Sequence, residues 1–146
     1  MFSRIYGAVL FGLNGCLITV ETDIANGLPS FDIVGLATVA VKEAKERVRT
    51  AVKNSGLAFP VRRITVNLAP ADMKKEGAAL DLPIAVALLV SSGQIAPESC
   101  EDSVFIGELS LDGLIRPTVG VLSMVIAAKE RGMKTVYVSP ENGDEA

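Results

Sequence analysis

A run of apolar residues at positions 82–89 constrains the fold of this chain more than any other feature of its sequence. Nearly every residue in the run is apolar, so a helix formed there is buried over most of its circumference. Pro83 is compatible with such a helix if it falls in the first turn, where an N–H group would have no partner. The run therefore predicts a helix inside the protein, not one lying on a wet surface.

Strands and hairpins are predicted on both sides of this helix along the chain. Short apolar or alternating runs bounded by turn residues indicate β structure, and the turns at Leu13-Asn14-Gly15 and Asp112-Gly113 indicate hairpins. The expected strands cover residues 5–11, 16–24, 31–34, 63–68, 104–111, 114–116 and 135–138. Hairpins supply antiparallel neighbours and helical crossovers supply parallel ones, so the layout predicts an α/β fold with mixed strand pairing.

Two further helices are predicted from helical spacing. A helix capped by Thr38 is expected to run to residue 54, with Val41 and Val48 on its apolar face and Gly56 as its stop. Another is expected at residues 119–131, and residues 69–77 are expected to form an exposed loop. Residues 141–146 resemble the start of one more helix. The chain is therefore interpreted as a single domain, residues 1–146, truncated at its C-terminal end.

Composition narrows the class of protein. A length of 146 residues fits one domain, and 49% hydrophobic with 21% charged residues is typical of a soluble globular protein. No stretch approaches the roughly 18 uninterrupted apolar residues of a membrane-spanning helix, so no membrane partner is expected. Cys16 and Cys100 have no metal-ligand spacing and are expected to be reduced thiols, which indicates a cytoplasmic location.

The chain contains no histidine, which removes the common catalytic triads and the usual zinc sites together. No phosphate-binding loop or dinucleotide fingerprint is present, so no cofactor is expected in this chain. The carboxylates Asp72, Glu76 and Asp81 could be drawn as a Mg²⁺ site. Lys74 and Lys75 lie beside them, however, so a polar loop with charge complementarity at a helix N-terminus is favoured.

Several spaced motifs carry a family resemblance. In chain order they read SFDIVGL at 30–36, VNLAPAD at 66–72, KEG at 75–77, DLPIA at 81–85, IGELSLDG at 106–113, RP at 116–117, AAK at 127–129 and TVYV at 135–138. The chain resembles the proteolytic domain of Lon and, more closely, the N-terminal domain of the Mg-chelatase-like AAA+ ATPases. This resemblance implies a ribosomal protein S5 domain 2-like α/β sandwich, the Lon protease domain-like fold.

The same resemblance implies a function and a set of partners. The domain is expected to support a homo-oligomer, a hexamer in the parent protein, that acts as a DNA-dependent motor. Within the family this implies a helicase for branch migration in natural transformation. ATP and Mg²⁺ are expected to bind an AAA+ domain downstream of residue 146, and the present domain is expected to contact DNA in some way.

The two residues that Lon uses for proteolysis are replaced here. Lon-type proteases pair a serine nucleophile with a lysine base, a dyad that needs no histidine. In the resemblance, Ala79 falls on the serine position and Leu122 on the lysine position. Neither aliphatic side chain can attack a carbonyl or move a proton, so no catalytic residue and no enzyme activity are expected in this chain.

Two alternatives stay open at this point. One is a peptidase with an unorthodox dyad formed by Lys74 or Lys75 with Ser91 or Ser123, although exposed lysines beside glutamate and isolated helix serines are usually spectators. The other is a pure protein-interaction adaptor whose surface only packs neighbouring subunits. Cleavage of casein would distinguish the peptidase from the other hypotheses. A salt-dependent DNA-binding assay would distinguish the DNA-contacting domain from the adaptor.

A stripe of cations is the candidate DNA contact. At about 100° per residue, four cations of the expected helix at residues 38–54 share one side, and two arginines further on could extend the patch. The candidate DNA-contacting residues are Lys42, Lys45, Arg49, Lys53, Arg62 and Arg63. An ordinary solvated helix face is the alternative, because Glu43 and Glu46 offer intrahelical pairing. Contact with backbone phosphates alone is expected, since no aromatic side chains are interleaved with the cations.

Overall fold

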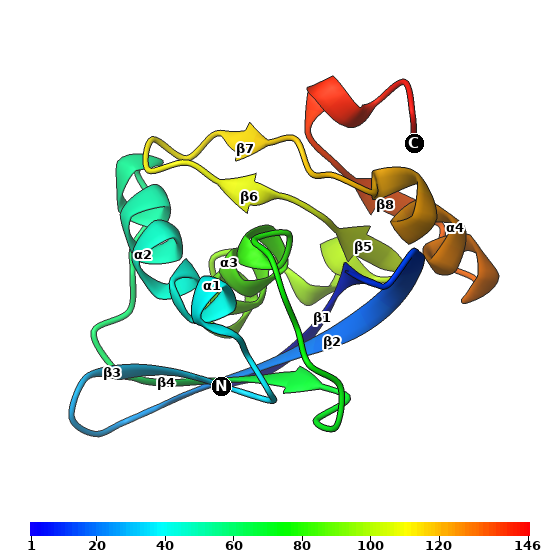
Figure 1. Cartoon of the computed structure of the whole chain (residues 1–146). Coiled ribbons are helices and arrows are strands. Elements are labelled where there is room, and N and C mark those ends of the chain that lie inside the picture. The colour runs from blue at the N-terminus through cyan, green and yellow to red at the C-terminus, as the bar shows by residue number, and fades with distance from the viewer.

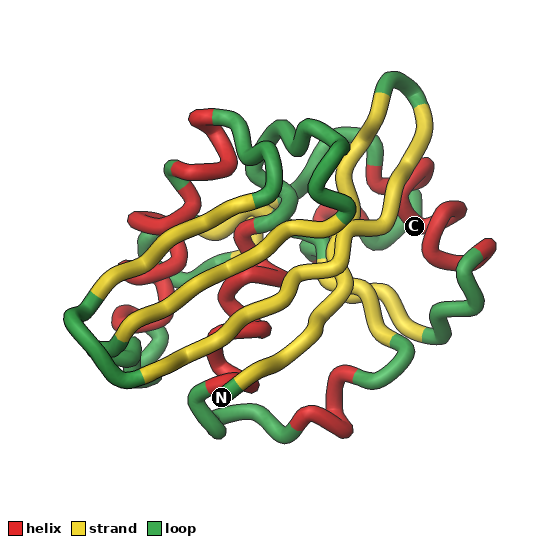
Figure 2. Tube along the Cα trace, turned by 90° about the horizontal axis from the view of Figure 1, so that it is seen from below, coloured by secondary structure: helices red, strands yellow, loops and turns green.

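The computed structural model describes all 146 residues and contains a six-stranded mixed sheet (Figures 1 and 2). From one edge to the other its strands are β3 (Ser30–Val34), β4 (Arg63–Ala69), β2 (Asn14–Ala25), β1 (Phe2–Phe11), β5 (Ser103–Phe105) and β8 (Thr135–Tyr137). The β1–β2 and β2–β4 pairs are antiparallel, whereas β3–β4, β1–β5 and β5–β8 are parallel. The predicted α/β class with mixed pairing is confirmed.

Four α-helices accompany the sheet. They are α1 (Val39–Lys42), α2 (Ala44–Asn54), α3 (Asp81–Ser91) and α4 (Val121–Glu130), and 3-10 turns occupy Pro97–Cys100 and Pro140–Asn142. Residues 141–146, which resemble the start of a helix, begin within the second of these turns. None of the helices combines the length and the apolar character needed to span a bilayer.

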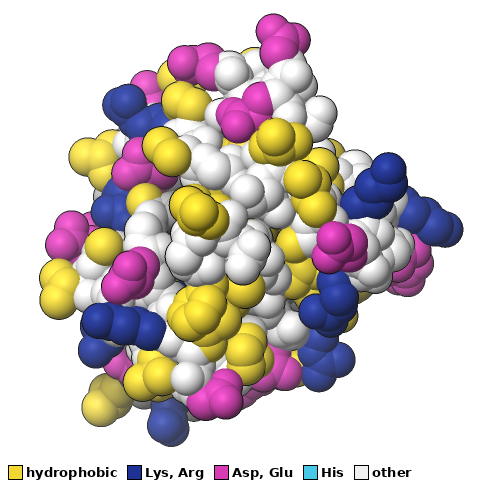
Figure 3. All heavy atoms as spheres, turned by 45° about the vertical axis from the view of Figure 1, so that its right-hand side comes forward, with side chains coloured by type: hydrophobic (Ala, Val, Ile, Leu, Met, Phe, Trp, Pro, Cys, Tyr) yellow, Lys and Arg dark blue, Asp and Glu magenta, His cyan; other side chains and the backbone are white.

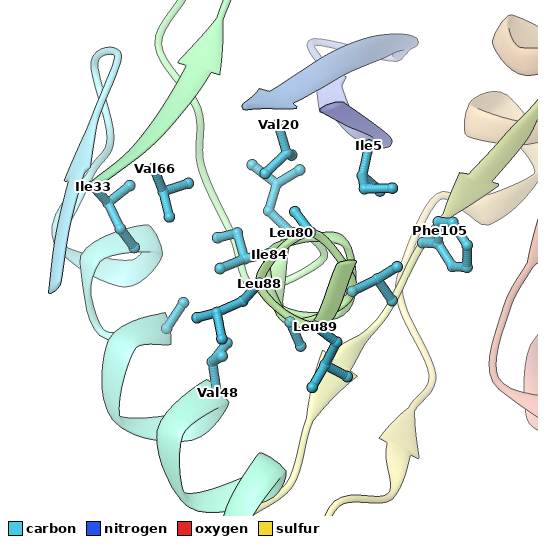
Figure 4. Packing of buried hydrophobic residues seen from close by; sticks show 14 of the residues in the cluster. Ile5, Val20, Ile33, Val48, Val66, Leu80, Ile84, Leu88, Leu89 and Phe105 are labelled. Atoms are coloured by element: carbon cyan, nitrogen blue, oxygen red, sulfur yellow. The ribbon is translucent and has the colours of Figure 1, made fainter. Parts of the chain in front are cut away.

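Helix α3 is the centre of the protein, as its apolar run predicts. Every residue of α3 except Leu82 is buried. Figure 4 shows the helix end-on, with Ile84 and Leu88 between Val20 of the sheet and Val48 of α2. Burying an aliphatic side chain of this size stabilises the fold by about 1.5–3 kcal/mol. The helix is thus held by apolar contacts on several sides.

Strand β1 is buried on both of its faces because residues alternate between two core clusters. Ile5 and Val9 point toward α3 and belong to the larger cluster, which also contains residues of α2. Ala8 points the other way and packs with Val121 and Met124 of α4. Successive side chains of a strand face opposite sides of a sheet. Helix α4 therefore lies across the sheet from α3, and the two clusters form layers on either side of β1.

The single helix predicted for residues 38–54 is wrong in one respect, because it is broken at Glu43 into α1 and α2. The Ala40 carbonyl accepts a hydrogen bond from the Arg47 guanidinium at 3.2 Å. One turn later, Glu46 donates its N–H to Glu43, three residues back, at 3.2 Å. The regular pattern of bonds four residues apart is interrupted there, so the two helices are separate elements. Thr38 precedes α1 as expected, but its hydroxyl forms no cap.

The single strand predicted for residues 104–111 is also wrong. It divides into β5 and β6 (Glu108–Leu109), and β6 pairs with β7 (Ile115–Arg116) in a separate two-stranded sheet. Between β5 and β6, the Gly107 N–H donates a hydrogen bond to the Ala79 carbonyl, and the Gly107 carbonyl accepts one from the Leu82 N–H. A Cβ at Gly107 would lie 2.5 Å from the Ile115 side chain. The backbone leaves the large sheet at Gly107 because it bonds there to the start of α3.

Two element boundaries differ by a few residues from those predicted. The β1–β2 turn consists of Gly12 and Leu13, and Asn14 already pairs with Phe11. Helix α4 begins at Val121, because Gly120 before it has a left-handed φ of 84°. A glycine adopts this conformation without the steric cost of a Cβ. The surface seen in Figure 3 has cations and anions intermixed with apolar side chains, in keeping with the small net charge of −3.

Candidate functional site

The positions that correspond to the Lon dyad lie in different surroundings. Ala79 is 6% exposed and packs in the smaller core cluster, just before α3. Leu122 is on α4 and is 51% exposed. A methyl group and an isobutyl group supply no nucleophile and no base at these places. The serine–lysine chemistry of Lon has no counterpart in these two side chains.

A groove of about 610 Å³ opens beside Ala79. Its apolar lining includes Val9 and Leu10 of β1 and Met124 of α4. Glu76 and Glu108 bring carboxylates to the same groove, and Leu122 is not among its lining residues. The volume is within the roughly 300–1,000 Å³ that ligand pockets commonly have. The groove is therefore large enough to hold several amino-acid side chains of a bound ligand.

The alternative lysine–serine dyads are not brought together. The Lys75 ammonium donates a hydrogen bond to the Pro70 carbonyl, and the Ser91 hydroxyl donates to Ser3 Oγ at 2.6 Å. Lys74 is exposed and lies 3.7 Å from a Glu76 carboxylate oxygen, while Ser123 is on α4. No hydrogen bond joins either lysine to either serine. These contacts give no support to an unorthodox peptidase.

The expectation that Lys75 is a solvated surface residue is wrong. Its side chain is completely buried. Its backbone N–H also donates a hydrogen bond to the Leu36 carbonyl at 3.1 Å, and its carbonyl accepts one from the Thr38 N–H at 3.2 Å. Burial lowers the pKa of Lys75, and the nearby charge of Asp72 opposes that shift. Desolvation disfavours the charged form of an amine. The loop at residues 69–77 is thus anchored by an inward-pointing lysine.

Of the three carboxylates expected in a polar loop, Asp72, Glu76 and Asp81, only Asp81 is buried. Its side chain is 1% exposed and accepts hydrogen bonds from Arg47 Nε at 2.6 Å, Arg47 Nη2 at 3.1 Å and the Leu109 N–H at 3.1 Å. Burial raises the pKa of Asp81, while the bonds from Arg47 and Leu109 oppose the rise. The hydrogen bond to Asp81 raises the pKa of Arg47. This buried ion pair joins α2, the start of α3 and β6.

The three carboxylates do not form a common ligand set. Asp72 and Glu76 are exposed, whereas Asp81 is committed to Arg47. No group of three or more cysteine, aspartate or glutamate side chains is gathered closely enough to hold a metal ion. Oxygen ligands of Mg²⁺ have to lie about 2.0–2.1 Å from one shared point. The loop offers no such point.

Three of the six candidate cations converge. Arg49 and Lys53 of α2 and Arg62 before β4 line a small pocket of about 190 Å³. Lys53 and Arg62 form no ion pair, whereas Arg49 Nη1 lies 2.7 Å from Glu46 Oε1. Two cations without a carboxylate partner therefore flank one that is partly neutralised. We call Arg49, Lys53 and Arg62 the cationic cluster.

The other three candidates lie apart from this cluster. Lys42 belongs to α1 and lines a different pocket together with Lys74. Lys45 is a half-buried residue of α2, and Arg63 is an exposed residue of β4. The break at Glu43 separates Lys42 from the regular stripe on α2. The predicted continuous stripe is thus reduced to its C-terminal half plus Arg62.

Sequence reasoning missed two aromatic side chains at the cationic cluster. The Arg49 guanidinium carbon lies 5.4 Å from the ring centroid of Phe59 and 6.0 Å from that of Phe31. The two rings are 5.7 Å apart and also line the small pocket. Cations within about 6 Å of a ring centroid are attracted by its negative face. The rings come from the β3 strand and the loop before β4, so helical spacing alone gave no signal for them.

Comparison with known proteins adds evolutionary relationships to this geometry. A family model described as subunit ChlI of Mg-chelatase matches residues 20–142. The YifB proteins of Salmonella typhimurium and Escherichia coli are 47% and 43% identical over 92% and 98% of the chain. Competence protein ComM of Haemophilus influenzae is 39% identical over 97% of the chain. Lon protease of Mycolicibacterium smegmatis is more distant, at 26% identity over 93% of the chain.

The matched regions are small parts of these relatives. The chain covers 26% of the Salmonella YifB protein, and 28% of both the Escherichia coli YifB protein and ComM. It covers 18% of the Lon protease. The chain thus spans about a quarter of the length of the YifB and ComM proteins that it matches.

Proposed function

The chain belongs to the family of the ChlI subunit of Mg-chelatase, and from this premise we propose that it is a non-proteolytic accessory domain of an AAA+ ATPase. Its proposed task is to support assembly of a hexameric motor and to hold the phosphate backbone of DNA. ATP and Mg²⁺ would bind the ATPase domain. The proposal includes the S5 domain 2-like classification and a cytoplasmic location, which the two free thiols Cys16 and Cys100 favour.

The loss of proteolysis rests on the two positions of the dyad. Ala79 and Leu122 carry no group that can act as nucleophile or base, and Lys75 and Ser91 are hydrogen-bonded to other partners. A domain that keeps the relationship to Lon without this chemistry serves by binding or by assembly. The name of one relative, competence protein ComM, favours a role connected with DNA, and branch migration in natural transformation is the proposed process.

The cationic cluster is the observation that carries the DNA contact. Lys53 and Arg62 are exposed and have no carboxylate partner, so their charge is available to a ligand. Arg49 is held in place by Glu46 and by two aromatic rings, which reduces the entropy lost when it binds. A pocket of about 190 Å³ is below the usual range for organic ligands and suits one phosphodiester group.

Phosphate contacts of this kind are independent of sequence and weaken with salt. Each neutralised phosphate of duplex DNA contributes about −0.9 to the slope of log affinity against log salt. Loss of Lys53 and Arg62 should therefore reduce the steepness of that slope by about 2. Replacing both with glutamate should also abolish measurable binding at physiological salt, because like charges then face the phosphates.

The test is a fluorescence anisotropy titration with labelled duplex DNA over a range of salt. Lys53→Glu with Arg62→Glu is compared with Lys129→Glu with Arg131→Glu, which makes the same change of net charge on exposed residues at the end of α4. Binding should be lost only in the first variant. Equal loss in both would indicate non-specific electrostatics. Retained binding in both would place the DNA contact elsewhere, and no binding by the unmodified protein would favour the protein-interaction adaptor.

A further inference from the structure

The groove beside Ala79 has a feature that the DNA contact does not use. None of the backbone N–H groups of residues 76–80 donates a hydrogen bond within the chain. Ala79 and Leu80 are themselves buried, at 6% and 1% exposure. A buried N–H without an acceptor costs about 1–3 kcal/mol, so nearly all such groups in folded proteins have a partner. Residues 76–79 of this loop line the groove, whereas Leu80 does not, so the N–H groups of residues 76–79 are the ones available to a ligand with carbonyl oxygens.

Two carboxylates stand at the same groove. Glu108 is half-buried at the start of β6, and its side chain forms neither an ion pair nor a hydrogen bond. Glu76 lines the groove from the loop, and its one ion-pair partner is the exposed Lys74, whose Nζ lies 3.7 Å from Glu76 Oε1. Arg116 is the cross-strand partner of Glu108, and Arg47 acts on Glu108 only at longer range, so neither cation forms a close ion pair with it. A half-buried carboxylate without a hydrogen-bonded cation can still accept one. The groove therefore favours a positive group over a negative one.

The apolar lining adds a third requirement. Val9, Leu10 and Met124 form part of the wall, and Val119 stands at the edge with 87% of its surface exposed. An apolar side chain or the methylene stem of a long basic side chain would be buried against this wall. The volume of about 610 Å³ is large enough for more than one side chain.

These three features together select one class of ligand. A free anion would satisfy the N–H groups but would face the carboxylates of Glu76 and Glu108. A simple cation or amine would pair with the carboxylates and leave the N–H groups without acceptors. A peptide in extended conformation supplies carbonyl oxygens, and a lysine or arginine side chain supplies both the positive charge and the apolar stem.

We propose that this groove docks an extended segment of another protein that carries a lysine or arginine. The carbonyl oxygens of the segment accept from the N–H groups of the loop before α3, and its basic side chain pairs with Glu108 and Glu76. The Ala79 methyl group cannot attack the bound backbone, so the segment is held and released intact. This docking is independent of the DNA contact at the cationic cluster, which lies on other elements.

The test uses two fluorescein-labelled, end-blocked hexapeptides, Gly-Leu-Ala-Arg-Leu-Gly and the same peptide with glutamate in place of arginine. Anisotropy titration should show binding of the arginine peptide and at least tenfold weaker binding of the glutamate peptide. Amide signals of residues 77–80 should shift in ¹⁵N-resolved NMR spectra of the complex. Equal affinity for the two peptides, or no shift at residues 77–80 at millimolar peptide, would overturn the proposal.

Variants of the groove make the test specific. Glu108→Gln keeps the size of the side chain and should weaken binding of the arginine peptide about tenfold, since a hydrogen bond to a charged group contributes about 1.5–3 kcal/mol. Val119→Lys changes an exposed residue, so folding is preserved, and places a competing cation at the edge of the groove. It should also weaken binding. Glu98→Gln, on the Pro97–Cys100 turn, is the matched control and should bind as the unmodified protein does. Unchanged binding by both groove variants would overturn the proposal.

Discussion

Replacing Arg47 with methionine should destabilise the protein by about 3–5 kcal/mol, because the buried Asp81 carboxylate then loses its cation. Arg47 supplies two of the three hydrogen bonds that Asp81 accepts, and the third comes from the Leu109 N–H. Two hydrogen bonds to a charged group contribute about 3–6 kcal/mol. The Arg47 side chain is 21% exposed, so water compensates part of the loss and the lower half of that range is expected.

Urea unfolding followed by far-ultraviolet circular dichroism measures this effect. With a denaturant slope of about 2 kcal/mol/M, the midpoint should fall by about 2 M. The deficit should also depend on pH. Burial already raises the pKa of Asp81, and removal of Arg47 raises it further, so the folded variant binds a proton more tightly than the unfolded chain. The loss of stability should be largest at neutral pH and should shrink as the pH falls through that raised pKa.

A double variant separates the charge from the packing. Arg47→Met with Asp81→Asn removes both charges and should recover a large part of the lost stability, because no uncompensated charge stays buried. A loss below about 1 kcal/mol for Arg47→Met alone would match an exposed ion pair and would refute the argument. A loss that does not vary between neutral and acidic pH would refute it as well.

Three other substitutions test features of the core and the groove. Lys75→Met should remove the rise of stability, measured by urea unfolding, between the lowered pKa of Lys75 and 10.5, because the native state binds that proton less tightly than the unfolded chain. Gly15→Ala should cost about 1–3 kcal/mol in urea unfolding, since its Cβ would lie 2.2 Å from the Ser123 carbonyl oxygen. Ala79→Ser with Leu122→Lys should give no casein cleavage, because residue 122 is half-exposed and does not line the groove beside Ala79. Substantial cleavage would show that the two positions meet.

The central helix and the hairpins were predictable from the sequence because each depends on local chemistry. The apolar run at residues 82–89 leaves α3 no polar face to expose, and β1 and β2 follow from alternation around a short turn. The break between α1 and α2 coincides with a side-chain hydrogen bond, from the Arg47 guanidinium to the Ala40 carbonyl. A tertiary hydrogen bond of this kind has no periodic signature in the sequence.

The candidate site was less predictable for the same reason. The sequence correctly placed Arg49 and Lys53 on one helix, but Phe31 and Phe59 meet Arg49 only because β3 and the loop before β4 fold against α2. The burial of Lys75 was missed because lysine is nearly always exposed and only tertiary contacts reverse that preference. The groove beside Ala79 depends on segments more than 100 residues apart, from Val9 to Met124.

The parallel pairing of β1 with β5 has a consequence for how the chain folds during synthesis. Tyr6 lies opposite Val104, so β1 has no partner on that edge until residue 104 has left the ribosome. At about 5–20 residues per second, the edge stays open for on the order of 5–20 s after the β1–β2 hairpin has emerged. Exposed strand edges are templates for pairing with other chains. A nascent chain of this protein therefore passes through an interval in which its first strand is open to aggregation, and that interval closes only when β5 docks.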